Sequence, residues 1–307
     1  MIQNNILLDL KKNKALYIMG LPAILFFLIF SYIPMAGVLI AFKDYNVVDG
    51  IIGSPFSGLR NFEFLFKSQD AYRITLNTLR LNCMFILFGT AAQVGTALLL
   101  NEMGNRFFRK MYQSLTFIPY FISWVVVGAF SYNLFATDIG LLNSLRSMAG
   151  LEALEWYSKA EYWPAILTFT YLWKWTGYGS IIYLSAIAGI DLDIYESATI
   201  DGCNKLGLAR YITLPMLIPT VLTMILLAIG RIFYGDFGMI FNIVKNNPLL
   251  YQTVDVIDTY VYRSFQGDGG NFAMGSAAGV YQSLMGFLVI MGANSLVRKL
   301  SRENALF

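Results

Sequence analysis

Apolar runs without charged residues recur along this chain, and charged segments separate them. Most contain no Asp, Glu, Lys or Arg over about twenty residues or more, and one further apolar run is broken only by Lys174. At 1.5 Å per residue, helices of this length cross a hydrocarbon core of about 30 Å. Barrel strands need only about ten residues and alternate strictly in polarity. The pattern predicts an all-α membrane protein with six transmembrane helices, at about 15–42, 74–101, 111–137, 162–190, 211–230 and 272–297.

The six runs define a membrane domain over residues 15–297, with a short segment at each end of the chain. Residues 1–14 place Ile6, Leu7 and Leu10 at helical spacing just before three lysines. This favours an amphipathic helix on the inner leaflet, although a disordered tail is an equal alternative for the first five residues. Residues 298–307 form a polar tail. Lys and Arg are about twice as dense on the side of both termini, which predicts that both are cytoplasmic.

Composition narrows the functional classes. The chain has 307 residues, of which 57% are hydrophobic and 13% charged, and its net charge is only +3. A soluble domain could not cover so much apolar surface, and no nucleic-acid partner is expected. There is no histidine, and Cys83 and Cys203 do not form a ligand pattern, so metal-dependent catalysis is improbable. We therefore expect a membrane protein that is not an enzyme.

The longest predicted cytoplasmic segment, about 191–212, has the pattern of two short helices joined at a glycine. Asp193 is a suitable N-cap, and Glu196 is a first-turn carboxylate that favours the helix dipole. Gly202 permits a chain reversal that a side chain would resist. The second helix runs toward Pro215, which opens the next span. The segment therefore predicts a helix–Gly–helix hairpin that stands off the membrane, where a partner protein could bind it.

The hairpin sequence resembles the EAA loop of bacterial ABC importer permeases. In that loop, E-A-A is followed by three residues, a glycine, nine residues and I-x-L-P. This chain keeps every spacing and departs once, with Ser in place of the first Ala. Segment 58–66 is similar to the corresponding segment of sugar permeases, and segments 255–263 and 293–298 are similar to those of the Gram-positive oligosaccharide subgroup. The residues that the resemblance implies in ATPase coupling are Glu196, Ser197, Ala198, Asp201, Gly202, Ile212, Leu214 and Pro215.

The resemblance implies a type I ABC importer permease fold and a set of partners in the bacterial cell membrane. In that family the hairpin docks on an ATPase subunit, and closure of the ATPase dimer moves the permeases between inward-facing and outward-facing states. An extracellular substrate-binding lipoprotein delivers the sugar, and a second homologous permease completes the pathway. No G-x-x-x-x-G-K-[ST] phosphate loop occurs in this chain, so we expect no cofactor in it. ATP and Mg are expected on the partner ATPase, and an oligosaccharide is expected as substrate.

A sugar path needs aromatic rings beside hydrogen-bonding groups, because sugars present both apolar ring faces and hydroxyls. The densest cluster of this kind lies in the fourth predicted span, where Lys174 is costly in lipid and should face a cavity or a carboxylate. Tyr178 is favoured because a sugar-contacting tyrosine of the related maltose permease looks to occupy the matching place. Aromatic packing and helix bridging are competing interpretations. The candidates are Tyr120, Tyr171, Lys174, Trp175, Tyr178, Arg231, Tyr234 and Gln282.

Other functional classes stay open as alternatives. An ion-coupled secondary transporter should carry acidic residues inside its spans, and the predicted spans contain essentially none. A membrane-embedded enzyme would need a nucleophile, a metal or an acid–base pair at depth. A permease for a solute other than sugar is a further alternative. Lys174, Arg231 and Arg80 together are compatible with an acidic oligosaccharide, although each could instead pair with an acid of the chain or a lipid phosphate.

Overall fold

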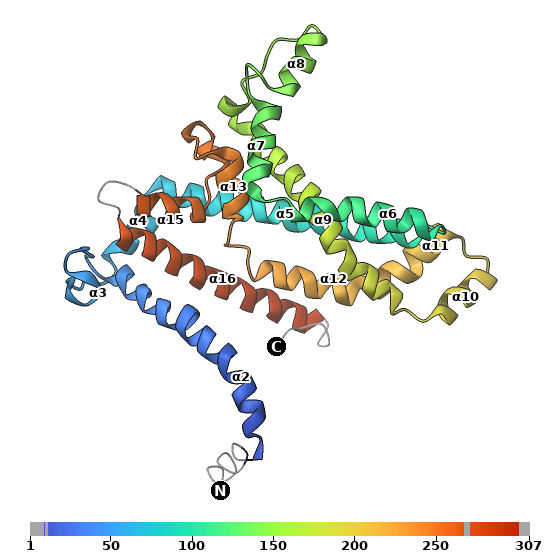
Figure 1. Cartoon of the computed structure of the whole chain (residues 1–307), viewed down its shortest axis with the longest axis horizontal. Coiled ribbons are helices and arrows are strands. Elements are labelled where there is room, and N and C mark those ends of the chain that lie inside the picture. The colour runs from blue at the N-terminus through green and yellow to red at the C-terminus, as the bar shows by residue number, and fades with distance from the viewer. Residues whose placement is uncertain (1–8, 10–11, 267–270, 301–307) are drawn as a thin grey trace.

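The computed structural model describes residues 9, 12–266 and 271–300, and within these ranges the chain forms helices and no named strand (Figure 1). Most of the predicted N-terminal segment, and the tail beyond residue 300, lie outside the described residues. The elements in chain order are α2 (Lys14–Phe27), η1 (Leu28–Tyr32), η2 (Ile33–Phe42), α3 (Gly50–Gly53), η3 (Arg60–Phe62), α4 (Glu63–Lys67), α5 (Gln69–Asn101), α6 (Arg106–Phe117), η4 (Ile118–Phe121), α7 (Trp124–Phe135), α8 (Leu141–Met148), η5 (Trp156–Ser158), η6 (Ala160–Tyr162), α9 (Trp163–Ala188), α10 (Leu192–Ile200), α11 (Lys205–Leu208), η7 (Ala209–Thr213), α12 (Leu214–Ile229), α13 (Phe237–Val244), η8 (Pro248–Leu250), α14 (Tyr251–Val254), α15 (Ile257–Gln266) and α16 (Phe272–Leu300).

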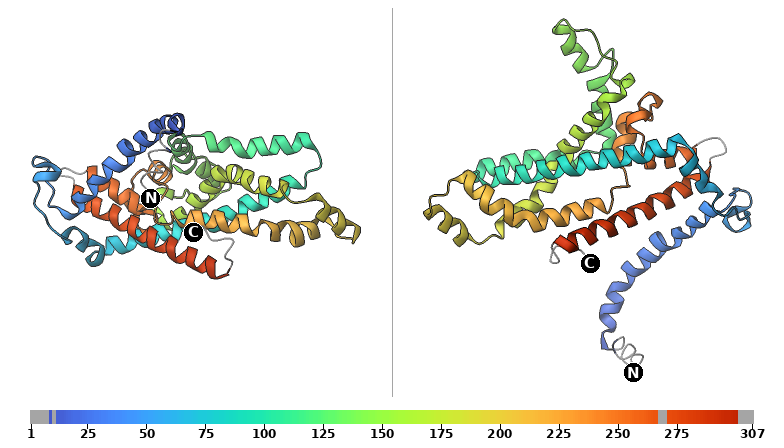
Figure 2. Two further views of the ribbon diagram at one scale, coloured as in Figure 1. Left: turned by 90° about the horizontal axis from the view of Figure 1, so that it is seen from below. Right: turned by 180° about the vertical axis from the view of Figure 1, so that it is seen from behind.

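The body of the molecule is a layer of helices that run along its long axis: α5, α6, α9, α12 and α16 (Figures 1 and 2). The most extensive contact joins α5 and α9, which lie side by side and run in the same direction. The helix α6 approaches α9 closely at Gly177, where an added Cβ would lie 2.0 Å from the carbonyl oxygen of Thr116. A glycine is therefore required there so that the two backbones can touch.

The predicted number of spans is confirmed only in part. Four helical stretches of the described chain are long and apolar enough to cross a membrane: Lys14–Phe42, Gln69–Asn101, Lys205–Ile229 and Phe272–Lys299. A fifth candidate is a bent pair, Arg106–Phe121 with Trp124–Phe135. The helix α9 has 26 residues and lies within the body, but its Trp, Tyr and Gly residues and Lys174 lower its mean hydropathy.

The third predicted span is not one helix, and the prediction of a continuous segment over 111–137 is wrong. The chain bends by 96° between η4 and α7. Pro119 lies in η4, and Ile122 and Ser123 are extended, so the helical hydrogen bonds stop there. Ser123 begins α7 as its N-cap, with its hydroxyl accepting from the amide of Val126 at 3.4 Å. Consequently α7 and α8 project from the body at the top of Figure 1.

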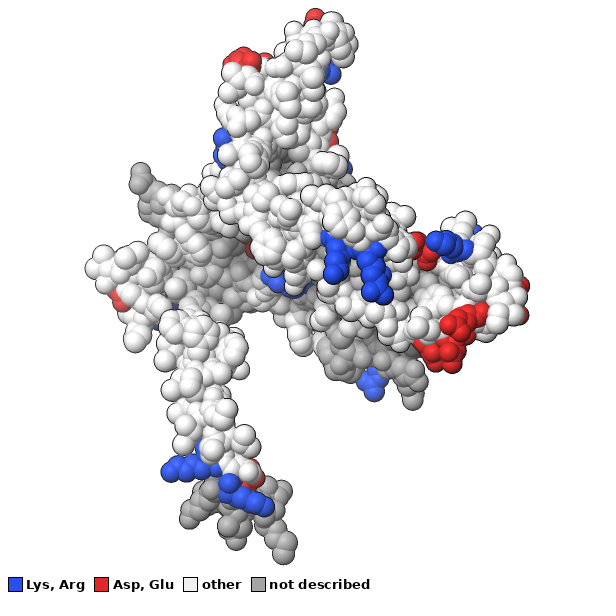
Figure 3. Space-filling view, turned by 45° about the vertical axis from the view of Figure 1, so that its right-hand side comes forward, with Lys and Arg blue, Asp and Glu red and all other residues white. Residues whose placement is uncertain are grey.

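The first span leaves the body as an arm, which we define as α2, η1 and η2. None of its most apolar window is buried within the chain, and the main contact of the arm with the body is where η2 meets α16 (Figures 1 and 2). Asn61 fixes that end by donating its amide to the carbonyl oxygens of Ala41 at 3.0 Å and Lys43 at 2.8 Å. Figure 3 shows an uncharged surface along the arm, with basic side chains at its free end.

An amphipathic segment over 254–265 precedes the last span. The structure places α15 there, but its apolar face is not on the surface. Ile257 and Thr259 are buried against α5 and α16. Arg263 makes an ion pair of 2.7 Å with Asp255, whose carboxyl group is fully buried. This cluster fastens α15 to the outer ends of the long helices.

Candidate functional site

The predicted hairpin forms at one end of the body, at the right of Figure 1, from α10 and α11. Gly202 has φ +86°, in the left-handed region that L side chains rarely adopt. The amide of Cys203 bonds to the carbonyl of Ala198 at 2.9 Å, and that of Gly202 to Thr199 at 3.0 Å. These two bonds form a Schellman motif, so α10 ends at a specified turn.

Two details of the hairpin differ from the prediction. The N-cap of α10 is Asp191, whose carboxylate accepts from the amide of Asp193 at 3.1 Å, whereas Asp193 lies inside the helix. The second helix does not stop before the next span, because α11 continues through a π-helical turn, η7, into α12. Tyr195 bonds to the hydroxyl of Thr213 at 2.9 Å and ties α10 to this continuous helix.

The coupling candidates present an accessible surface. Glu196, Ser197 and Asp201 are exposed, as are Leu214 and Pro215 at the start of α12, while Ala198 and Ile212 are half-buried. Ile200 is 86% exposed and Leu206 79% exposed, on opposite sides of the turn. Large apolar side chains this exposed on a polar loop indicate a surface that another protein covers. Figure 3 shows acidic and basic side chains gathered at the same end.

A cavity of about 550 Å³ lies between α5, α9, the start of α7 and the segment that follows α12. Four predicted substrate-path residues line it: Tyr171 and Trp175 from α9, and Arg231 and Tyr234 after α12. Phe85 stacks on Tyr171, with ring centroids 4.6 Å apart and planes 8° apart. Aromatic walls with a few polar groups suit the apolar faces and hydroxyls of a sugar.

Residues 230–236 are non-helical and form one wall of this cavity. Side chains from other helices donate hydrogen bonds to the backbone carbonyl oxygens of this segment. Asn82 donates to the carbonyl oxygens of Ile232 at 2.9 Å and Tyr234 at 3.1 Å. The buried Gln282 donates to the carbonyl of Phe233 at 2.7 Å, so its amide holds this wall from behind. Irregular backbone at the end of a span is tolerated where it lines a cavity and its polar groups are paired.

Lys174 points away from the cavity and into the break of the third span. It is 5% exposed, and its ammonium donates to the carbonyl oxygens of Pro119 at 3.4 Å and Tyr120 at 3.1 Å, and also to that of Ile122. The ammonium also lies 4.7 Å from the ring centroid of Trp124. The carbonyl of Pro119 also accepts from the amide of Ile122 at 3.2 Å, whereas the carbonyls of Tyr120 and Ile122 have no backbone partner among the described residues. The side chain of Lys174 therefore caps the broken helix end.

The remaining aromatic candidates form a stack behind Trp175. The rings of Tyr120 and Tyr178 are 4.4 Å apart and nearly parallel, and both meet the ring of Trp175 edge-on. The indole nitrogen of Trp175 is buried and has no hydrogen-bond partner among the described residues. Tyr178 and Tyr120 thus support a cavity wall and do not line the cavity described here.

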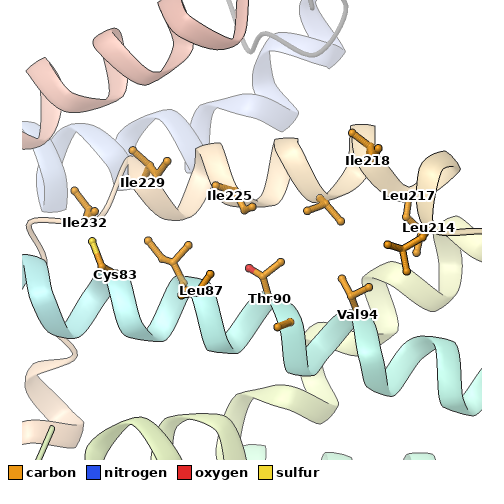
Figure 4. Close-up of a pocket in the computed structure, with 13 residues that line it drawn as sticks. Cys83, Leu87, Thr90, Val94, Leu214, Leu217, Ile218, Ile225, Ile229 and Ile232 are labelled. Carbon is orange, nitrogen blue, oxygen red and sulfur yellow. The ribbon is translucent and has the colours of Figure 1, made fainter. Parts of the chain in front are cut away.

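A second, larger cavity does not have the chemistry for a sugar. It has a volume of about 650 Å³ and runs as a groove between α5 and α12 (Figure 4). Its labelled side chains are nearly all aliphatic, with Thr90 and Cys83 as the exceptions. A sugar there would lose the hydrogen bonds of its hydroxyls to water without replacement. The smaller cavity around Trp175 is therefore the candidate substrate site.

Eight residues that line the cavity were not predicted, and the polar and aromatic ones among them are Asn82, Phe85, Trp124, Asp236 and Phe237. Asp236 is the N-cap of α13 and accepts from the amide of Met239 at 3.0 Å. It follows the fifth predicted span by a few residues, so a search for acidic residues within spans could not find it. An Asn inside an apolar run, as at Asn82, was the one available signal for an internally paired polar side chain.

Comparison with known proteins places the chain in a family. Residues 93–302 match the family described as binding-protein-dependent transport system inner membrane component. The protein LplB of Bacillus subtilis (strain 168) is 34% identical, over 96% of this chain and 92% of LplB. The polygalacturonan/rhamnogalacturonan transport system permease protein YteP of the same organism is also 34% identical, over 98% of this chain and 93% of YteP.

Solved structures agree with these relatives. A chain of a bacterial alginate ABC transporter, solved with its alginate pentasaccharide-bound periplasmic protein, superposes with a TM-score of 0.86 and 33% identity, covering 95% of this chain and 97% of that one. A second solved structure is of a bacterial ABC transporter involved in the import of the acidic polysaccharide alginate. Its chain superposes with a TM-score of 0.87 and 32% identity, covering 97% of this chain and 99% of that one. The predicted resemblance is confirmed: the chain belongs to the binding-protein-dependent transport system inner membrane component family and is a permease subunit of a sugar ABC importer.

Proposed function

We propose that this subunit forms one half of the path by which an oligosaccharide crosses the bacterial cell membrane. The observation that carries the proposal is the cavity around Trp175, where aromatic walls lie beside paired non-helical backbone. Its volume of about 550 Å³ is within the range of small-molecule sites and would hold a segment of a few sugar units. A second homologous permease is the partner expected to complete the path.

Energy for transport is proposed to enter through the hairpin. Its turn is specified by the positive φ of Gly202 and the two bonds that close α10, and Tyr195 joins α10 to the helix that leads into α12. A force on α10 would therefore reach α12, whose far end carries Arg231 at the cavity. The proposed companion is an ATPase dimer that binds ATP and Mg, with no cofactor expected in this chain. Both chain termini are proposed to lie on the same, cytoplasmic side.

Substrate delivery is proposed to occur on the opposite side of the membrane, from an extracellular substrate-binding lipoprotein. The projecting α7 and α8 lie away from the hairpin and are the largest extension of the body other than the arm (Figure 1). The outer surface of α8 carries exposed apolar side chains, including Leu141, Leu145 and Met148. Membrane lipid is the proposed surrounding of the arm and of the aliphatic groove.

The sugar path is tested by uptake into proteoliposomes that contain the complete importer and its binding protein. Trp175→Ala removes a cavity wall, and we expect sugar uptake to fall about tenfold or more. Trp173→Ala is the matched control, because Trp173 lies two residues away and faces a groove between α7 and α9 instead. Equal losses in both variants, or none in either, would contradict the assignment of the cavity.

The coupling role is tested separately, by the variants Gly202→Asp and Glu196→Lys. We expect the variant subunits to insert into the membrane but to lose the ATPase on purification and to lose uptake. The control is Gly20→Ala, because Gly20 lies in the arm with no other atom near an added Cβ. A Gly202→Asp importer that keeps its ATPase and transports normally would remove the hairpin from the mechanism.

A further inference from the structure

The basic residues near the candidate path are not equivalent in the structure. Lys174 is already bonded to backbone carbonyl oxygens. Arg80 is exposed on α5 and does not line the cavity. Arg231 lines the cavity, and within the described residues its guanidinium makes no hydrogen bond or ion pair. Of these basic groups, only the guanidinium of Arg231 is therefore free to bind a substrate in the cavity.

Asp236 is the carboxylate of this cavity, and it is already engaged. It accepts from the amide of Met239 at 3.0 Å as the N-cap of α13. Lys174 and Arg231 both act on it electrostatically, but neither is within ion-pair distance. The carboxylate of Asp236 is thus held by the start of α13 and does not form an ion pair with the guanidinium of Arg231.

Arg231 is exposed at the cavity and has no ion-pair partner among the described residues, so an anionic group of a substrate can bind its guanidinium directly. The planar guanidinium presents its donors in a fork that matches a carboxylate in two parallel bonds. Trp175 lines the same cavity, whereas its indole nitrogen is buried. The aromatic rings would meanwhile cover the apolar faces of the sugar.

We propose that the transported oligosaccharide is acidic, with carboxylate groups on its sugar rings, and that Arg231 is the residue that selects for them. This rests on the proposed function of the cavity as the oligosaccharide path. One of the similar solved structures comes from an importer of the acidic polysaccharide alginate, which agrees with an acidic substrate. Arg231 is thus a specificity-determining residue, whereas the aromatic walls would accept acidic and neutral sugars alike.

The experiment compares acidic oligosaccharides with neutral versions of the same chains. Oligosaccharide digests of polygalacturonate and of alginate are prepared, and part of each is carboxyl-reduced so that length and linkage stay the same. A sugar phosphate is included as an anion of different geometry. ATP-dependent uptake is measured with the complete importer in proteoliposomes, for wild type, Arg231→Met and Arg231→Lys. Arg298→Met, at the far end of α16, is the control for loss of one positive charge.

For wild type we expect uptake of at least one acidic digest, well above that of its reduced form. Arg231→Met should lower acidic uptake about ten- to hundredfold, and Arg231→Lys should lie between, because lysine keeps the charge and loses the fork. Equal or better uptake of the reduced digests, insensitive to Arg231→Met, would overturn the acidic class and leave oligosaccharide import standing. Uptake of the sugar phosphate alone would overturn carboxylate recognition. ATP-dependent uptake of none of the probes would count against the proposed function itself.

Discussion

Replacing Lys174 by methionine tests whether a buried ammonium holds the bend of the third span. Methionine keeps much of the volume of the side chain and removes the three hydrogen bonds to the carbonyls of the break. Hydrogen bonds between helices in membranes average about 0.6 kcal/mol each, whereas a buried acceptor left unpaired costs about 1–3 kcal/mol. Because two of the three carbonyls belong to half-buried residues that water can reach in part, we expect a loss of about 2–4 kcal/mol.

The assay is thermal unfolding of the purified importer in detergent, together with sugar uptake. A loss of this size in a subunit of about 300 residues corresponds to a fall in Tm of about 3–6 °C. Uptake should fall as well, because Trp124 begins α7 directly after the break and lines the cavity. Lys174→Arg, which keeps a charged donor, should recover part of both losses.

The matched control is Lys67→Met, at a lysine whose ion pair with Glu63 is exposed to solvent. Such surface pairs contribute about 0–1 kcal/mol, so the Tm should stay nearly unchanged. If Lys174→Met unfolds at the wild-type temperature and transports normally, the carbonyl cap has no role in holding the bend. Equal destabilisation by the methionine and arginine variants would also refute the reasoning, because it would show that volume and not charge matters.

Three further substitutions test other parts of the structure. Gly177→Ala places a Cβ 2.0 Å from the carbonyl of Thr116 and should destabilise the importer by about 1–3 kcal/mol in thermal unfolding, whereas Gly95→Ala, which meets nothing within 4 Å, should not. In Gly202→Ala the added Cβ meets no atom either, but the φ of +86° at this position should destabilise the hairpin by about 1–2 kcal/mol. We therefore expect the variant to retain less ATPase on purification, and unchanged retention would contradict the role of this turn. Asn82→Leu removes the hydrogen-bond donor of two carbonyl groups in the cavity wall and should raise the KM for sugar uptake about tenfold. An unchanged KM would show that this wall does not shape the site.

The elements that local sequence controls were the predictable ones. Uncharged runs of sufficient length must be helical in lipid, because no water is present to satisfy the backbone. The hairpin also follows from nearby residues, since Gly202 and its flanking caps act within one or two turns. Even there, Asp191 and Asp193 are both competent N-caps two residues apart, so the boundary was placed wrongly.

The cavity and the bend could not be derived in the same way, because they depend on contacts between distant segments. A proline in a span is compatible with a mild kink or with a break, and here the ammonium of Lys174, more than 50 residues later, pairs the freed carbonyls. Asn82 reaches carbonyls 150 and 152 residues away. The sequence predicts that such polar side chains need partners, but only the packing of α5, α9 and α12 determines which partners they find.

The bare arm has a consequence for how the subunit can be produced. Because α2 to η2 bury almost none of their apolar surface in the chain itself, lipid or a companion protein must cover them at every stage. A detergent that strips this cover exposes a helix of 29 residues that can adhere to other copies. Expression of the chain alone should therefore give aggregated, polydisperse protein. Co-expression with the other components of the importer should give a homogeneous sample.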